Sequence, residues 1–226
     1  MKYKNLFFDL DDTLWAFSAN ARDTFEEMYY KYKLDAFFDS FEHFYSLYQR
    51  RNIELWMEYG NGQITKEELN RQRFLYPLAA VGAGDFALAK AYSDYFFAVI
   101  PTKRRLMPHA KEVLDNLASR YNLYILSNGF RELQYRKMCS GGIESYFKKV
   151  ILSDLKPASQ IFHFALSATQ SELRESLMIG DSWEADIVGA NGVGMHQAFY
   201  NVSGRTEFPF QPTYQLKDLK DLLEIL

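Results

Sequence analysis

The feature that most restricts the fold of this chain is an alternation of short apolar runs and helical patterns after Pro101. The apolar runs are NLYILSNG, KKVILSD, SLMIGD and MHQAFY, and amphipathic segments such as HAKEVLDNLASR and IFHFALSAT separate them. Short buried strands that alternate with helices are typical of βαβ units, in which the strands run parallel. The sequence therefore predicts an α/β fold with a parallel sheet.

The first apolar run, NLFFDLDDTL, ends in a cluster of carboxylates. Asp9, Asp11 and Asp12 fall within four residues directly after a segment that reads as a buried strand. Like charges so close together repel and are costly to desolvate, so such a cluster needs a cation or a reaction that handles anions.

Residues 15–100 have a different pattern, with the periodicity of helices throughout. Apolar residues recur three and four positions apart in ARDTFEEMYYKYKL, FEHFYSLYQRRNIELWMEY, TKEELNRQRFLYPL and DFALAKAYSDYFFAVI, which predicts four helices. Thr65 and Glu68 have the spacing of a capping box at the start of the third helix. We expect residues 1–14 and 101–226 to form the α/β core and residues 15–100 to be inserted as a helical domain. Leucines from 216 to 226 predict a final amphipathic helix.

Composition excludes several classes of function. The chain has 226 residues, a net charge of -3 and a pI near 5.9, so it lacks the basic footprint of a nucleic-acid-binding protein. No apolar run is long enough for a membrane span and no signal peptide opens the chain, which favours a cytoplasmic protein without a membrane partner. The single cysteine, Cys139, excludes an internal disulfide, is expected in the core, and makes a zinc cluster improbable.

Parallel sheets bind ligands beyond the carboxyl ends of their strands, so the first polar residues after each apolar run are the candidates. These residues are Asp9, Asp11, Thr13, Ser127, Asn128, Asp154, Lys156 and Asp181. Several carboxylates can share a site with a phosphate dianion only if a divalent cation and a lysine neutralise the excess charge. Mg²⁺, with its preference for oxygen ligands and phosphate, meets that requirement. A carboxylate can also attack phosphorus and form an aspartyl-phosphate.

Four short motifs give the chain a family resemblance. DLDDT after an apolar strand, LSNG, KP before a helix, and GDSWEAD occur in the order of the four motifs of the haloacid dehalogenase superfamily, which the chain resembles from Phe7 to Asp186. The resemblance implies a Rossmann-like core with a helical C1-type cap and a phosphatase activity. FFDLDDTLWAF and YGNGQIT are most similar to the pyrimidine nucleotidase group of that superfamily.

The resemblance also implies roles for the acids. Asp9 would be the nucleophile and a magnesium ligand. Asp11 would be the general acid and base, and its backbone carbonyl would be a second ligand. Asp181 would complete the metal site.

Other residues would support this chemistry. Ser127 and the backbone N–H groups around Asn128 would bind the phosphate, and Lys156 would neutralise charge on the transferred group. Thr13 would hold the first loop in place. Asp186 would orient Lys156 or a metal-bound water.

One motif departs from the family pattern. Only Asp154 and Leu155 separate Ser153 from Lys156, so the loop before the lysine is shorter than is usual in the family. Either a tight turn still brings Lys156 to the site, within about 4 Å of Asp9 or Asp186, or its side chain points into solvent.

The expected function is Mg²⁺-dependent hydrolysis of small phosphorylated metabolites, with nucleoside 5'-monophosphates as candidate substrates, by a monomer or weak homodimer. Asp11 argues against a haloacid dehalogenase proper, which does not need the second acid. A phosphomutase of the same superfamily and a receiver-like phospho-switch remain alternatives. A switch would need neither Asp11 nor a cap.

Substrate selection is expected to involve a few aromatic residues. Most aromatics between residues 15 and 100 suit the core of a small helical bundle. The candidates that would face the substrate are Trp15, Phe17, Trp56, Tyr59 and Asn61.

Overall fold

The apolar runs form the parallel sheet that the sequence predicts. In the computed structural model, which describes residues 2–226, the strands are β1 (Asn5–Phe8), β2 (Asn122–Ser127), β3 (Lys149–Leu152), β4 (Ser176–Gly180), β5 (His196–Tyr200) and β6 (Tyr214–Leu216). Their spatial order is β3-β2-β1-β4-β5-β6, and all neighbours are parallel. The order reverses between β1 and β4, and parallel sheets bind ligands beside such a switch point.

The chain divides into two units. The sheet unit comprises the residues up to Phe17 and Arg104–Leu226, and the helical unit comprises Ser18–Lys103. The sequence analysis expects the inserted helical domain to span residues 15–100.

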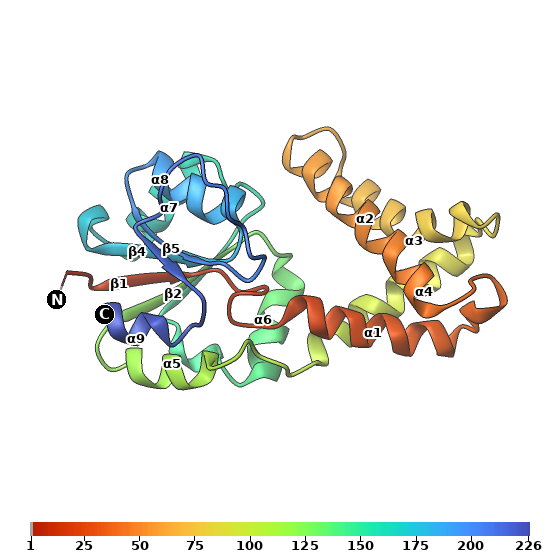
Figure 1. Ribbon diagram of the computed structural model, residues 1–226, viewed down its shortest axis with the longest axis horizontal. Coiled ribbons are helices and arrows are strands. Elements are labelled where there is room, and N and C mark those ends of the chain that lie inside the picture. The colour runs from red at the N-terminus through yellow and green to blue at the C-terminus, as the bar shows by residue number, and fades with distance from the viewer. Residues whose placement is uncertain (1) are drawn as a thin grey trace. The chain divides into compact units, whose positions relative to one another are not determined.

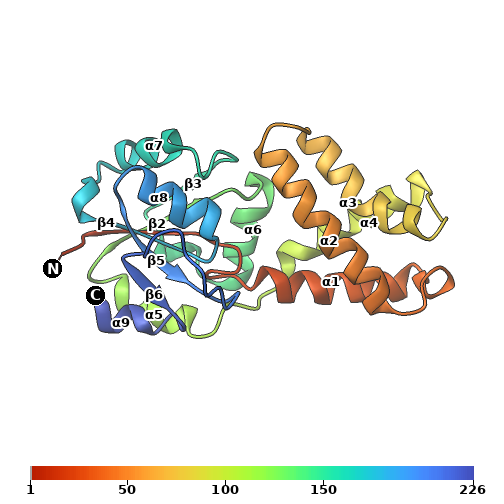
Figure 2. The ribbon, with the colours of Figure 1, turned by 45° about the horizontal axis from the view of Figure 1, so that its top comes forward.

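Helices cover both faces of the sheet, which makes the α/β class of the fold certain. They are α5 (Ala110–Leu117), α6 (Arg131–Gly141), α7 (Ser159–Thr169), α8 (Gly189–Gly192) and α9 (Asp221–Ile225), and a π-helical segment, Trp183–Val188, leads into α8. Helices α7 and α8 lie on one face, and α5 and α9 lie on the other (Figure 1, Figure 2). Beneath α7 and α8, Phe7, Tyr124 and Met178 of the strands pack with Ile161 and Phe162. Strands buried on both faces explain why these runs are continuously apolar.

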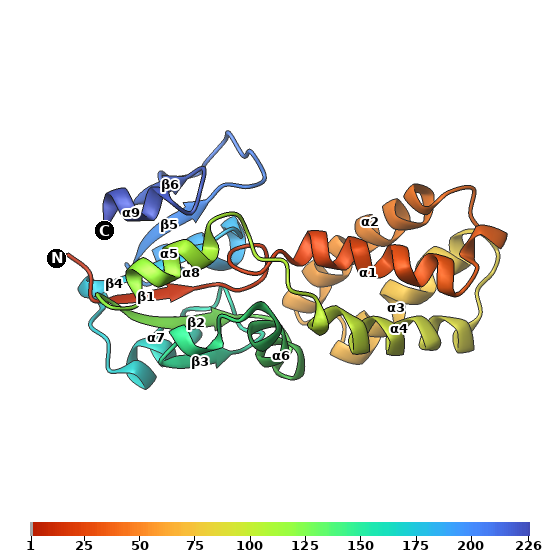
Figure 3. The ribbon, with the colours of Figure 1, turned by 90° about the horizontal axis from the view of Figure 1, so that it is seen from below.

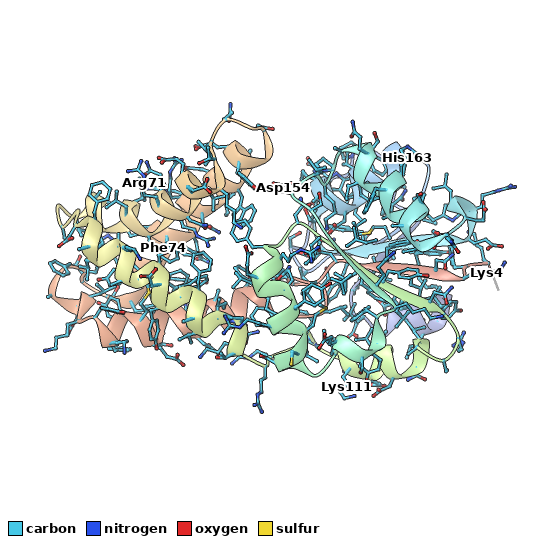
Figure 4. All side chains as sticks on the ribbon, turned by 180° about the vertical axis from the view of Figure 1, so that it is seen from behind. Lys4, Arg71, Phe74, Lys111, Asp154 and His163 are labelled. Atoms are coloured by element: carbon cyan, nitrogen blue, oxygen red, sulfur yellow. The ribbon has the colours of Figure 1, made fainter. Side chains whose placement is uncertain are left out.

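The helical unit contains the four helices that the 3.6-residue periodicity predicts. They are α1 (Phe17–Lys31), α2 (Phe41–Gly60), α3 (Lys66–Ala80) and α4 (Phe86–Val99), which lie side by side in Figure 3. Phe25 is at the centre of the unit, with its ring centroid 4.0 Å from that of Tyr48 and 4.8 Å from that of Phe96. Figure 4 shows Phe74 inside the unit and Arg71 on its surface.

The start of α3 is capped as expected. The hydroxyl of Thr65 accepts a hydrogen bond from the backbone N–H of Glu68 at 3.1 Å. The carboxylate of Glu68 turns forward along the helix to Arg71 and Gln72.

Two expectations about individual segments are wrong. The C-terminal leucines do not form one helix, because Leu216 belongs to β6, which pairs with the otherwise open edge of β5, and α9 has only five residues. Cys139 is exposed rather than in the core, because α6 buries the neighbouring Met138 instead. Within residues 2–226, no helix combines the length and the apolar composition that a membrane crossing requires.

Candidate active site

Polar residues from several strand ends gather at the carboxyl edge of the sheet. Asp9 follows β1, Ser127 ends β2, and Asp181 follows β4. In Figure 4, Lys4 before β1 and Asp154 after β3 mark the opposite ends of the sheet unit, and the predicted residues belong to the end with Asp154. The predicted residues therefore gather at the carboxyl edge of the sheet, where the sequence places them.

Lys156 reaches this edge in spite of its short loop. Its Nζ lies 2.9 Å from Asp9 Oδ1, donates a second hydrogen bond to Asp186 Oδ1, and has a side chain that is 2% exposed. Burial alone would lower the pKa of the Lys156 ammonium, but the carboxylates of Asp186 and Asp9 outweigh burial and raise that pKa above its ordinary value. Of the two alternatives for Lys156, the tight turn is the one that the chain adopts.

The turn is held by Asn128 at the end of β2. The Asn128 side chain donates to the carbonyl of Lys156 at 2.9 Å and accepts from the N–H of Lys156 at 3.0 Å. Ser153 Oγ accepts from the N–H of Leu155, and the Lys156–Pro157 peptide bond is cis. The Asn128 amide thus fixes the lysine loop, a contact that the sequence did not reveal.

Three carboxylates form a cluster beside Lys156. Oxygen atoms of Asp9, Asp181 and Asp186 all lie within 4.8 Å of one another. Burial first, and then the charges of Asp9 and Asp186, raise the pKa of Asp181 to about 8, although its Oδ1 accepts a 2.8 Å hydrogen bond from Thr13 Oγ1. One ammonium does not balance three carboxylates, so this oxygen-rich cluster fits a hard divalent cation such as Mg²⁺.

This cluster differs in one member from the expected set of metal ligands. Asp186, expected to act only through Lys156 or a water, contributes its carboxylate to the cluster. The Asp11 side chain binds other residues instead, and a role for its backbone carbonyl stays a prediction.

Asp186 owes its position to an unusual helix and to a glycine. It lies on the π-helical segment Trp183–Val188, and its Oδ2 accepts from the N–H of Ser182 at 3.1 Å. A Cβ on Gly180 would lie 2.1 Å from the same Oδ2. The glycine before Asp181 therefore leaves space for a carboxylate from elsewhere in the chain.

Sequence reasoning missed two residues that contact Asp11. Lys137 Nζ lies 2.8 Å and 2.9 Å from the two oxygens of Asp11, and Gln134 Nε2 lies 3.0 Å from Asp11 Oδ2. Gln134 Nε2 is also 3.0 Å from Ser127 Oγ. Both residues lie on α6, whose first turn follows β2, so their three-residue spacing just after a strand end was the available signal.

The expected specificity residues have different environments. Trp15 is fully buried, so its ring faces are not open for stacking with a ligand, and Phe17 is half-buried. Trp56 and Tyr59, on α2 of the helical unit, contact each other edge to face with centroids 5.8 Å apart. Asn61 is exposed at the C-cap of α2.

Comparisons with known proteins agree with the motifs. The family model for haloacid dehalogenase-like hydrolases matches residues 3–194. Pyrimidine 5'-nucleotidase PynA of Streptococcus pneumoniae is 31% identical over 100% of this chain and 96% of its own length, and pyrimidine 5'-nucleotidase YjjG of Escherichia coli is 28% identical over 100% and 99%. A crystal structure of the HAD-hydrolase YfnB from Bacillus subtilis bound to magnesium has a TM-score of 0.87 and 25% identity, and covers 100% of this chain and 99% of that one.

The family match covers most of the chain, and the motif residues that led to it lie together at one edge of the sheet. The protein is therefore an enzyme that belongs to the haloacid dehalogenase-like hydrolases.

Proposed function

We propose that the protein is a Mg²⁺-dependent phosphomonoesterase that acts on small phosphorylated metabolites through an aspartyl-phosphate. The observation that carries this proposal is the Lys156 ammonium held between Asp9 and Asp186, beside Asp181. A second acid, Asp11, follows Asp9 by two residues. In this proposal Asp9 is the nucleophile, Lys156 supplies the counter-charge, and Asp11 is the proton donor.

In the first step, a carboxylate oxygen of Asp9 attacks phosphorus and the bond from phosphorus to the leaving oxygen breaks. Asp11 gives its proton to that oxygen, so the product leaves as an alcohol. Lys156 and the Ser127 hydroxyl stabilise the negative charge on the phosphoryl oxygens. When bound by Asp9, Asp181 and Asp186, Mg²⁺ would screen the carboxylates from the phosphate.

In the second step, Asp11 takes a proton from water as the water oxygen attacks phosphorus. The acyl-phosphate bond breaks, inorganic phosphate forms, and Asp9 regains its carboxylate. Asp11 alternates between acid and base, which explains why a phosphatase keeps this acid and a dehalogenase does not need it.

We further propose that Ser18–Lys103 act as a cap that selects the substrate, with pyrimidine nucleoside 5'-monophosphates as the favoured class. The names of the two nucleotidase relatives and the similarity of the YGNGQIT turn support this choice. A cytoplasmic location and a monomeric or weakly dimeric state stay predictions.

The test is phosphate release from a panel of nucleotides, sugar phosphates and small acid phosphates, with Mg²⁺ and with EDTA. We expect Mg²⁺-dependent release, and we expect Asp9→Asn to lose more than tenfold in kcat, at least about 1.4 kcal/mol of transition-state stabilisation. The control is Glu144→Gln, which alters an exposed acid of the sheet unit. Full activity in EDTA, or an active Asp9→Asn variant, would refute the mechanism. Strict dependence on a bisphosphate activator would identify a phosphomutase instead.

A further inference from the structure

The carboxylate of Asp11 is held by a helix that lies far from it in the sequence. Three hydrogen bonds reach its two oxygens, two from Lys137 Nζ at 2.8 Å and 2.9 Å and one from Gln134 Nε2 at 3.0 Å. Both donors come from α6, so the orientation of Asp11 depends on the helix that follows β2.

The two donors are themselves buried and fixed. Lys137 is 3% exposed, and its Nζ lies 5.1 Å from the centroid of the Trp15 ring and 5.0 Å from that of Phe17. Gln134 is fully buried, and a Cβ on Gly129 would lie 1.9 Å from its Nε2. Aromatic faces over the ammonium and a glycine beside the amide leave each donor one place to lie.

Stability alone does not account for this arrangement. Burying an ammonium and an amide costs free energy that their hydrogen bonds only offset, and apolar side chains of similar volume often serve the fold as well. Gln134 also donates to Ser127 Oγ at 3.0 Å. The same amide therefore connects the proposed proton donor to the proposed phosphate ligand.

We infer that Lys137 and Gln134 are positioning residues, which align the Asp11 carboxyl group with the leaving oxygen and tie that alignment to the Ser127 hydroxyl. The inference rests on the proposed phosphatase function and goes beyond it by assigning α6 a part in proton delivery. Trp15 and Phe17 then act on the reaction through Lys137, and not by stacking against the substrate.

Proton delivery matters only when the leaving group is poor, and this gives the inference its test. The leaving oxygen of an alkyl phosphate needs a proton, whereas p-nitrophenyl phosphate releases p-nitrophenolate, which is a stable anion without a proton. The value of kcat/KM reports on steps up to formation of the aspartyl-phosphate, so it isolates this effect. A role in folding alone would lower kcat/KM for both esters by the same factor.

The variants are Lys137→Met and Gln134→Met, assayed with p-nitrophenyl phosphate and with the alkyl phosphate that the wild type hydrolyses best. We expect kcat/KM for the alkyl ester to fall at least tenfold, and that for the aryl ester to fall less than threefold. Arg131→Met removes a positive charge from an exposed position in the first turn of α6 and should change neither value.

A double-mutant cycle keeps the test decisive even if Lys137→Met lowers the stability of the fold. In an Asp11→Asn background, where no proton can be delivered, we expect Lys137→Met to change kcat/KM for the alkyl ester by less than threefold. Equal losses on both esters, or a full additional loss in that background, would overturn the inference and leave the phosphatase function intact. Failure of the wild type to hydrolyse any phosphate ester with Mg²⁺ would instead refute the proposed function, and the inference with it.

Discussion

Asp181 has a carboxyl group whose pKa lies far above its ordinary value. Its ordinary pKa is 3.8, and burial together with the charges of Asp9 and Asp186 raises its pKa to about 8. Ionisation of Asp181 is therefore less favourable in the metal-free folded protein than in the unfolded chain. The stability contributed by the protonated form is complete below the unfolded pKa and is lost as the pH rises through about 8.

This shift predicts how Mg²⁺ binding varies with pH. The cation must displace the Asp181 proton, and the pKa of Asp186 is also raised, to about 7. The affinity should therefore weaken by about tenfold per pH unit from about pH 8 to about pH 7, and more steeply below that. Thermal melts should show a larger stabilisation by Mg²⁺ at pH 8.5 than at pH 6. Asp181→Asn, which has no proton to displace at this position, should bind Mg²⁺ weakly and with a shallower dependence on pH, which comes from Asp186. A wild-type affinity that is constant from pH 6 to pH 8.5 would contradict the prediction.

Residues that follow an apolar run could be predicted from the sequence, and residues on a helix face could not. The pattern located Asp9, Ser127 and Asp181, because the carboxyl ends of parallel strands lie at the same edge of the sheet and bring the residues there close together. Lys137 and Gln134 have side chains that usually belong to a solvated helix face. Their three-residue spacing after the end of β2 was a weak signal in the sequence, and the tertiary fold shows that this part of α6 faces Asp11.

At the scale of elements, the side chain of Asn128 contributes two of the hydrogen bonds that hold the segment between β3 and α7. The amide of Asn128 bonds both the N–H and the carbonyl of Lys156, so it replaces the contacts that a longer loop would supply. The position of the Lys156 ammonium thus depends on the residue that follows the neighbouring strand, β2.

Removing that amide should release the segment. We expect Asn128→Ala to cost about 1 to 3 kcal/mol of unfolding free energy, since two hydrogen bonds are lost and their backbone partners are partly buried. Hydrogen exchange measured by NMR should show the Lys156 N–H less protected. Asn128→Asp keeps the acceptor for that N–H and should preserve its protection better. An unchanged exchange rate in Asn128→Ala would show that other contacts hold the turn.

Helices were easier to predict than the end of the chain. The four helices of the helical unit follow from local periodicity and a capping residue at Thr65. The C-terminal leucines fit a helical pattern equally well. However, Tyr214–Leu216 pair with the edge of β5, so Leu216 belongs to a strand and not to a helix. A competing partner distant in sequence is not visible in a local pattern.

At the scale of the whole molecule, the helical unit is rich in aromatic side chains, and their role needs an explanation. Most of these aromatic side chains form the core of the unit, which is centred on Phe25. Trp56 and Tyr59 form a separate pair near the end of α2. If the unit acts as a cap, this partly exposed pair is a candidate surface for a nucleobase.

Trp56→Ala tests that role. Stacking is worth about 1 to 3 kcal/mol per base, so we expect KM for a pyrimidine nucleotide to rise roughly fivefold or more. We expect kcat to change less, because stacking holds substrate and transition state alike. Phe86→Ala, at an exposed aromatic of the same unit, is the control. A panel in which sugar phosphates exceed every nucleotide tenfold would reject the nucleotidase assignment and keep the phosphatase.

The insertion of a whole helical unit after β1 also sets the order in which the molecule can be built. Asn5 pairs with Asn122 and Ser176, which are 117 (122 − 5) and 171 (176 − 5) residues further along the chain. At about 5 to 20 residues per second, β1 leaves the ribosome roughly ten to thirty seconds before β4. Helical contacts are short in sequence and form as they emerge. The nascent chain must therefore keep the apolar side chains of Leu6, Phe7 and Phe8 from aggregating until the centre of the sheet has been synthesised around them.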